Sequence, residues 1–466
     1  MKTRTITGRF ILLLIAAFLA ILPTAADATI QGITGTNFAL IARADTISTG
    51  DGDSMWMWGY ASGGGRMQYP GPTFIVNQGA NITIRLRNQL PVPVSIVIPG
   101  QTVTASGGVQ GLLTREVPAS PTPGTTGPTT VIYRFTASQP GTYMYYSGTR
   151  SDLQVEMGLI GTIIVRPTGF SATTTCPASA TPSTSCRKAY NDPSTAYHRE
   201  YLFVLSEADP LIHQQVAFAN NNAALINQVD MTRRRATDWF INGRNFPDTM
   251  ADAGVAWLPT QPYNCMPMML PSEKVLIRMV SAGRDFHPLH THGQNHLVVA
   301  RDARLLSTNP TRVSPPPTPD LAVSDYSTTS VPGETVDAIW GPWTGAKLGW
   351  DIYGTAAINP HTCTPGADGF DPVTHEYCAD HYKPIPVQLP SQSVISIGVV
   401  GSGMWSGTPY LGQMSSLPPS ITGQNPMAGY SYMWHSHSER ELTTNNIFPG
   451  GMASMALVVP VGTPIP

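Results

Sequence analysis

Residues 432–437 read YMWHSH, and residues 143–148 read YMYYSG. A second pair of matched blocks precedes them in the same order. Residues 84–101 begin IRLRNQ and end VIPGQ, whereas residues 277–294 begin IRMVSA and end HTHGQ. The members of each pair have equal lengths. This internal repeat predicts that the chain contains two copies of one domain.

The segments around these blocks have the pattern of β-strands. NITIRLR at 81–87 and KVLIRM at 274–279 alternate polar and apolar residues, which is typical of a half-buried strand. Turn signals such as PGP at 70–72 and PG at 140–141 separate the strands. No long stretch has helical periodicity. We therefore predict an all-β protein of two β-barrel or sandwich domains.

Composition supports this fold class and excludes a nucleic-acid partner. Only 12% of the 466 residues are charged, and glycine and proline number 43 each, as in loop-rich β proteins. The 27 basic and 29 acidic residues give a net charge of −2. A surface that binds nucleic acid requires an excess of basic residues, so we expect none here.

Residues 1–28 are predicted to be a cleaved signal peptide. Basic residues precede an apolar run over 10–22 that is short for a membrane span, and ADA at 26–28 fits the small-residue cleavage pattern. No later segment is apolar enough to cross a bilayer. We expect a secreted or periplasmic protein without a transmembrane anchor.

The repeat and the composition suggest domain limits. Domain one is expected over 29–168 and domain two over 198–462. The segment 169–197, rich in Thr, Ser, Pro and Ala, is the expected linker. A Pro-rich stretch over about 301–395 is expected to be a long irregular insertion in domain two.

Four of the five cysteines can form disulfides in an oxidising compartment. Cys176 and Cys186 flank one short loop, and Cys363 and Cys378 flank another. Cys265 is left over, beside several methionines. We favour a buried thiol in a Met-lined core, and a soft copper(I) site is the alternative.

Two His-x-His pairs, His290 with His292 and His435 with His437, form the predicted metal site. On a strand, residues i and i+2 point to one face, so each pair projects together. The repeat puts both pairs at equivalent points of the domain, so the two strands can be neighbours. Neutral imidazole suits copper or zinc. The alternative is two pairs of histidines that bind no metal. His287 is a less certain ligand.

Copy one has no imidazole at the matching positions. Val97 and Pro99 correspond to the first pair, and Tyr146 and Gly148 correspond to the second. We expect domain one to bind no metal, and the sequence leaves open whether Tyr146 replaces a lost ligand.

Several motifs resemble those of the multicopper oxidases, the family of laccases, bilirubin oxidases and two-domain oxidases. The motifs are HPLHTHG at 287–293, MWHSH at 433–437, FING at 240–243 and PGP at 70–72. The resemblance covers nearly the whole chain after the signal peptide. It implies two cupredoxin-like Greek-key β-barrels and copper as the cofactor.

The resemblance also implies roles for the histidines. His290 would match a type 2 copper ligand, whereas His292, His435 and His437 would match type 3 ligands. His287 would match a ligand of the blue type 1 copper.

The departures from the family are as informative as the matches. The family's first-domain H-W-H and H-S-H blocks fall on VIP at 97–99 and YSG at 146–148. The blue-copper cysteine is Ser436, and the downstream histidine is Glu441. A serine hydroxyl cannot supply the thiolate of a blue site. We expect a reduced copper site and no blue type 1 centre.

Three functions remain open at this point. The first is a copper-dependent oxidoreductase, whose catalytic residues and small-molecule or electron-donor partner are not identified by the sequence. The second is a non-enzymatic copper-binding protein of the cell envelope. The third is a structural or assembly protein. Two-domain relatives often form trimers, so the resemblance also allows a homo-oligomer.

Overall fold

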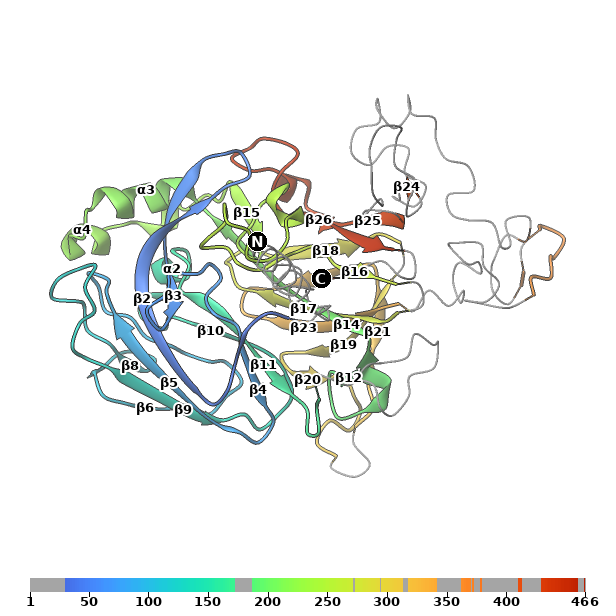
Figure 1. The fold of residues 1–466 in the computed structure, drawn as a ribbon, viewed down its shortest axis with the longest axis horizontal. Coiled ribbons are helices and arrows are strands. Elements are labelled where there is room, and N and C mark those ends of the chain that lie inside the picture. Colours follow the sequence, from blue (N-terminus) through green and yellow to red (C-terminus); the bar gives the residue numbers. More distant parts are fainter. Residues whose placement is uncertain are drawn as a thin grey trace, which may run out of the picture.

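β-Strands dominate the computed structural model, and the helices are few and short (Figure 1). This confirms the predicted all-β class. The structure describes residues 30–171, 187–270, 273–293, 295–312, 317–341, 362–369, 371–372, 378, 410–412, 429–459 and 465. The predicted signal peptide at 1–28 and the cysteines Cys176 and Cys186 lie outside these residues.

The first half of the chain forms two sheets. One has the order β1 (Ile33–Thr34), β4 (Phe74–Asn77), β11 (Ile160–Arg166), β10 (Gly141–Tyr146). The other has the order β3 (Ser54–Ser62), β2 (Asn37–Ser48), β5 (Asn81–Asn88), β9 (Val131–Thr136), β6 (Thr104–Ser106). A small hairpin of β7 (Val109–Gln110) and β8 (Arg115–Glu116) stands apart.

The alternation in the sequence explains how these strands pack. In β5, Ile82, Ile84 and Leu86 are buried, while Arg85 and Arg87 are exposed. Successive side chains of a strand point to opposite faces, so the apolar set lies between the sheets. The strand predicted at 81–87 is confirmed.

The second half also forms two sheets. One has the order β15 (Asp238–Ile241), β14 (Arg199–Ala208), β17 (Val275–Ser281), β23 (Thr335–Trp340), β19 (His296–Arg301), β20 (Arg304–Leu305), with β21 (Val323–Asp325) on β19. The other has the order β16 (Met268–Met269), β26 (Ala453–Val458), β25 (Gly429–Ser436), β18 (His287–Thr291), β22 (Ser327–Ser330), with β24 (Tyr410–Gly412) on β25.

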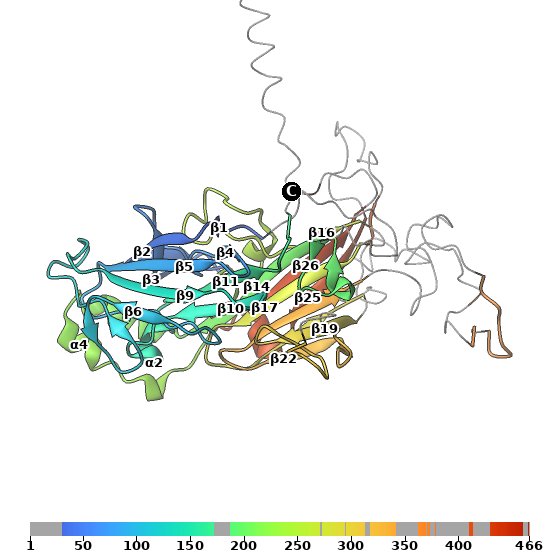
Figure 2. The same cartoon turned by 90° about the horizontal axis from the view of Figure 1, so that it is seen from below.

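The two halves have the same topology, as the internal repeat predicts. The order β3-β2-β5-β9-β6 matches β15-β14-β17-β23-β19, and the order β4-β11-β10 matches β16-β26-β25. The parallel pairs also correspond, because β2 with β5 matches β14 with β17. Figure 2 shows the blue and cyan strands of the first half beside the yellow and red strands of the second.

The described α-helices are short; α2 (Ser151–Gln154) lies between β10 and β11, and α3 (Pro210–Phe218) and α4 (Ala223–Asn227) follow β14. Asp209 caps α3 by accepting a hydrogen bond from the Leu211 amide at 2.9 Å. Ile212 and Val216 of α3 are buried in the core of the first half. No helix among the described residues is long and apolar enough to cross a membrane.

The predicted insertion over 301–395 needs correction at its start. β20, β21, β22 and β23 all fall within that range and belong to the sheets of the second half. β20, β21 and β22 have only two to four residues, which cannot display an alternation. Most of the range beyond Trp340 lies outside the described residues. The domain limits at 168 and 198 stay predictions.

The cysteines inside the described residues have distinct environments. Cys363 and Cys378 form a disulfide. Cys265 is a buried free thiol whose Sγ donates to the Ile241 carbonyl at 3.0 Å, and burial raises the pKa of its thiol to about 12. It packs in one core with Met266, Met268 and Met269. This environment fits the buried thiol, because metal binding requires the thiolate.

Buried ion pairs join the two halves. Arg166 of β11 forms an ion pair with Glu200 of β14, whose other neighbour is Arg278 of β17 at 3.1 Å. Arg278 also contacts Asp337 of β23 at 3.4 Å, and Asp337 accepts a hydrogen bond from Thr142 of β10 at 2.6 Å. All five side chains are buried. Each charge has a partner on a neighbouring strand, which fixes how the sheets of the two halves face each other.

Neutralising Glu200 should weaken the fold. Burial alone would raise the pKa of this carboxyl, but Arg166 and Arg278 lower it to about 2. Glu200→Gln leaves the buried Arg166 guanidinium without a counter-charge and Arg278 with Asp337 alone, which costs about 3–5 kcal/mol of unfolding free energy. Denaturant unfolding measures this loss. The control is Asp45→Asn at the exposed Arg66 pair, where we expect less than about 1 kcal/mol. Equal losses in the two variants would contradict the assignment.

Candidate metal centre

Strand pairing brings the two predicted histidine pairs together. β18 lies between β22 and β25, antiparallel to both. In the β18–β25 register, His290 is directly opposite His435. Directly opposed residues of an antiparallel pair have Cβ atoms about 5 Å apart on the same face. The sequence predicted that these strands could be neighbours, and they are.

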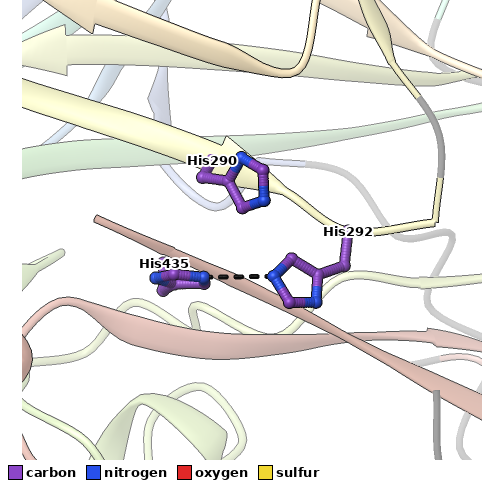
Figure 3. A group of neighbouring side chains, drawn as sticks. All are labelled: His290, His292 and His435. Atoms are coloured by element: carbon purple, nitrogen blue, oxygen red, sulfur yellow. Dashed lines mark hydrogen bonds between the residues drawn. The ribbon is translucent and has the colours of Figure 1, made fainter. Parts of the chain in front are cut away.

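Three imidazoles form the centre of the site. Nitrogen atoms of His290, His292 and His435 all lie within 4.8 Å of one another. His292 Nε2 and His435 Nε2 are 3.2 Å apart. Figure 3 shows the three rings gathered around a common point, with the dashed line joining these two nitrogen atoms. Among the described residues, no other group of three His, Cys, Asp or Glu side chains converges in this way.

His437 lies at the rim of this group. Its ring centroid is 4.7 Å from that of His290 and 5.6 Å from that of His435. Its side chain is 52% exposed, and its Nδ1 is 4.0 Å from Glu439 Oε1. The structure therefore brings three of the four predicted ligands into one group and leaves the fourth beside it.

The three central histidines are neutral, as metal ligands must be. Burial and the neighbouring imidazoles together lower the pKa of His292 and of His435 to about 4. Burial and His437 also lower the pKa of His290. At neutral pH, protons therefore do not compete with a metal ion for these imidazole nitrogens.

The hydrogen-bond partners of the imidazoles indicate which nitrogen atoms can bind a metal. His435 Nδ1 donates to the Ser436 carbonyl at 2.7 Å, so its Nε2 carries the lone pair that faces His292. His290 Nδ1 is buried and has no hydrogen-bond partner within the described residues. Buried imidazole nitrogens without partners are the donors that copper or zinc would satisfy, so the residues present fit such an ion.

His287, the less certain ligand, contacts two buried carboxylates. Its Nε2 is 2.9 Å from Glu207 Oε2 and its Nδ1 is 3.0 Å from Glu441 Oε2. Burial would lower its pKa, but the two carboxylates raise it to about 9. His287 is therefore an imidazolium with both nitrogens occupied. His287 thus lies outside the group of three imidazoles, and its role as a ligand stays a prediction.

The ion pairs of His287 continue toward the first half. Glu207 also contacts Arg234, and Arg234 contacts Glu156 beside α2. Both glutamates and His287 are buried. This network occupies the place where the family resemblance implies a blue copper, and its neighbour Ser436 carries no thiol. The charged side chains at this position are paired with one another.

Sequence reasoning missed Glu207. It lies 80 residues before His287 in the chain, at the end of β14, and no motif connects the two. Glu441 could have been found, because it stands where the family has a histidine. The pairing of Glu207 with His287 depends on the parallel β14–β17 contact, which only the folded sheet displays.

The matching position in the first half is filled by other side chains. Val97 pairs with Tyr146 through backbone hydrogen bonds of 2.8 and 3.1 Å, in the same relation as His290 and His435. A Cβ on Gly148 would lie 2.7 Å from the Val97 side chain. The structure confirms the alignment of the repeat at this point. No group of metal-ligating side chains converges there among the described residues.

Part of the first half of the chain is similar in sequence to known multicopper oxidases. Residues 45–169 match the profile of the family described as Multicopper oxidase. Over 103 residues the chain is 33% identical to "Multicopper oxidase MCE" of Talaromyces pinophilus. That match spans 22% of this chain and 15% of the relative.

Several solved copper proteins have similar folds at low sequence identity. "Multicopper Oxidase mgLAC" has a TM-score of 0.49 and 15% identity, with 93% of this chain and 88% of that chain covered. "Blue Copper Oxidase from Nitrosomonas europaea" has a TM-score of 0.48 and 15% identity, with 91% and 86% covered. A copper nitrite reductase from the same organism has a TM-score of 0.41 and 18% identity, with 67% and 86% covered.

The His287 ion pairs should make stability depend on alkaline pH. The pKa of His287 is raised from 6.5 to about 9 by folding, so its contribution is fully present below pH 6.5 and is lost as pH rises through 9. The loss is on the order of 3 kcal/mol. Urea unfolding at several pH values should show this decrease in the parent protein and not in His287→Gln. The matched control His198→Gln should keep it. A parent protein equally stable across this range would refute the assignment.

Proposed function

We propose that this chain is a copper-binding protein with its site in the second half, because residues 45–169 match the multicopper oxidase family. The proposed ligands are His290, His292 and His435, with His437 as a fourth ligand from the rim. One observation carries the proposal: nitrogen atoms of three neutral histidines lie within 4.8 Å of one another.

Copper is favoured over zinc by the family. Imidazole nitrogens accept both metals, and copper is bound more tightly than zinc by a given set of ligands. Copper is also the cofactor that the multicopper oxidase match implies. Bound copper would supply one-electron chemistry at this point.

The site supports one ion or a closely spaced pair, and no companion group of metal ligands accompanies it among the described residues. The position of the blue copper holds the His287 ion pairs, and the matching site of the first half holds Val97 and Tyr146. Four-electron reduction of dioxygen needs several metal ions and a route for electrons between them. These observations favour non-enzymatic copper binding.

An oxidoreductase with a single site is the second candidate. The half-exposed His437 favours it, because a rim ligand leaves one side of the ion open to a small molecule. We also propose export through the predicted signal peptide, an electron-donor partner if the site turns over, and a homo-oligomer as in two-domain relatives. Cell fractionation and light scattering test the first and the last of these.

Removing one histidine from each pair should abolish the copper site. The double variant His290→Ala with His435→Ala leaves at most two imidazoles of the proposed site, those of His292 and His437. Copper retained after gel filtration should fall from about one equivalent to nearly none, as measured by elemental analysis. His437→Ala should retain the ion with weaker affinity. The control His198→Ala, outside the site, should bind as the parent does. Unchanged copper in the double variant would locate the site elsewhere.

Oxygen uptake separates the two candidate functions. With added copper and a phenol as reductant, we expect no oxygen uptake above that of an equal concentration of free copper, because the blue copper position is filled. The double variant His290→Ala with His435→Ala sets the background. Rapid phenol oxidation coupled to water formation, absent from that variant, would establish the oxidoreductase instead.

A further inference from the structure

A buried series of hydrogen bonds runs behind the histidine group. Thr291 Oγ1 is 2.8 Å from His296 Nδ1, and His296 Nε2 is 2.7 Å from Thr328 Oγ1. Thr328 Oγ1 in turn lies 3.3 Å from Asp325 Oδ2. Thr291, His296 and Thr328 are 2%, 1% and 0% exposed. We call these four residues the threonine–histidine series. It links β18, β19, β21 and β22.

The series has one possible direction. The Asp325 carboxylate can only accept, so the Thr328 hydroxyl donates to it. Thr328 Oγ1 then accepts from His296 Nε2–H, which leaves a lone pair on His296 Nδ1 for the Thr291 hydroxyl. Backbone amides of Tyr326 and Ser327 hold Asp325 Oδ1 at 2.8 and 3.1 Å.

A neutral His296 satisfies this arrangement and an imidazolium does not. A protonated ring would donate from both nitrogens, and the Thr291 hydroxyl could then no longer donate to Nδ1. Burial lowers the pKa of His296 to about 4, which keeps the ring neutral. Geometry and charge therefore agree on the Nε2–H tautomer.

Thr291 is the residue between two of the proposed copper ligands. Its side chain points to the face of β18 opposite to His290 and His292, because successive side chains alternate. β18 ends at Thr291, and Gly293 beyond His292 has a φ of 96°, where the chain leaves the strand. The orientation of His292 therefore depends on how firmly Thr291 is held.

We propose that the threonine–histidine series is a positioning device that orients His290 and His292 for the metal by anchoring Thr291 from behind. The inference rests on the proposed copper site and assigns roles to His296, Thr328 and Asp325. These residues touch no metal. They act through Thr291, by holding the strand that carries two of the three ligands.

Thr328 and Thr329 provide a matched pair of variants. Thr328 is buried in the series, whereas Thr329 is its exposed neighbour on β22. Thr328→Val keeps the shape and removes the acceptor for His296, so copper affinity should fall about 10-fold or more, measured by competition with a chelator. Thr329→Val should bind copper as the parent does. The copper electron paramagnetic resonance spectrum should change in Thr328→Val and stay unchanged in Thr329→Val.

A second position distinguishes positioning from packing. Thr291→Val removes the donor at constant volume and should lower copper affinity as Thr328→Val does. Thr291→Ser restores the hydroxyl and should restore both the affinity and the spectrum, although it fills less space. Weaker binding in Thr291→Ser than in Thr291→Val would show that volume matters and overturn the proposal.

The tautomer of His296 is measurable in the metal-free protein. Nitrogen-15 NMR of the parent should show the Nε2–H form, and Thr328→Val should lose that preference. A parent protein with Nδ1–H or an imidazolium at neutral pH overturns the inference. So does parent-like copper binding in both valine variants. Failure of the parent itself to bind copper overturns the proposed function and this inference together, whereas the other two outcomes leave the copper site standing.

Discussion

The antiparallel pairing of β18 with β25 is the constraint on which the metal centre depends. It puts His290 opposite His435, and the preceding and following strands of the sheet hold both in that register. A slip of one residue would turn each histidine to the other face of the sheet. The core residues Leu289 and Trp434 would then lose their burial, so the hydrophobic core and the metal site require the same register.

The second half of the molecule contains buried carboxylates that are paired with positively charged side chains. Glu207 and Glu441 are buried, and a buried carboxylate requires a nearby positive charge. His287 supplies one as an imidazolium, and Arg234 supplies another to Glu207. An imidazolium and a guanidinium therefore provide the positive charge that these two buried carboxylates require.

The first half has no imidazole at the positions that match the histidine group. Val97 and Tyr146 keep the backbone pairing of the ligand strands, and Gly148 leaves space that the Val97 side chain fills. Loss of a ligand alone would leave a cavity or an unpartnered imidazole, each of which costs stability. The two copies therefore share one backbone geometry but differ in the side chains at this position, which form an apolar contact in the first copy and a histidine group in the second.

The sequence alone determined the repeat, the all-β class, and the two His-x-His pairs as one site, because these depend on local alternation and on comparison of the chain with itself. Tertiary structure decided what distant residues do to one another. In the folded protein His287 contacts Glu207, 80 residues away in sequence, and lies outside the histidine group, whereas His437 lies at the rim of that group. The structure also shows strands within the Pro-rich stretch after residue 301, and it shows the threonine–histidine series that holds Thr291. Hydrogen bonds and ion pairs between strands leave no periodic trace in sequence, since each depends on a register that the whole sheet sets.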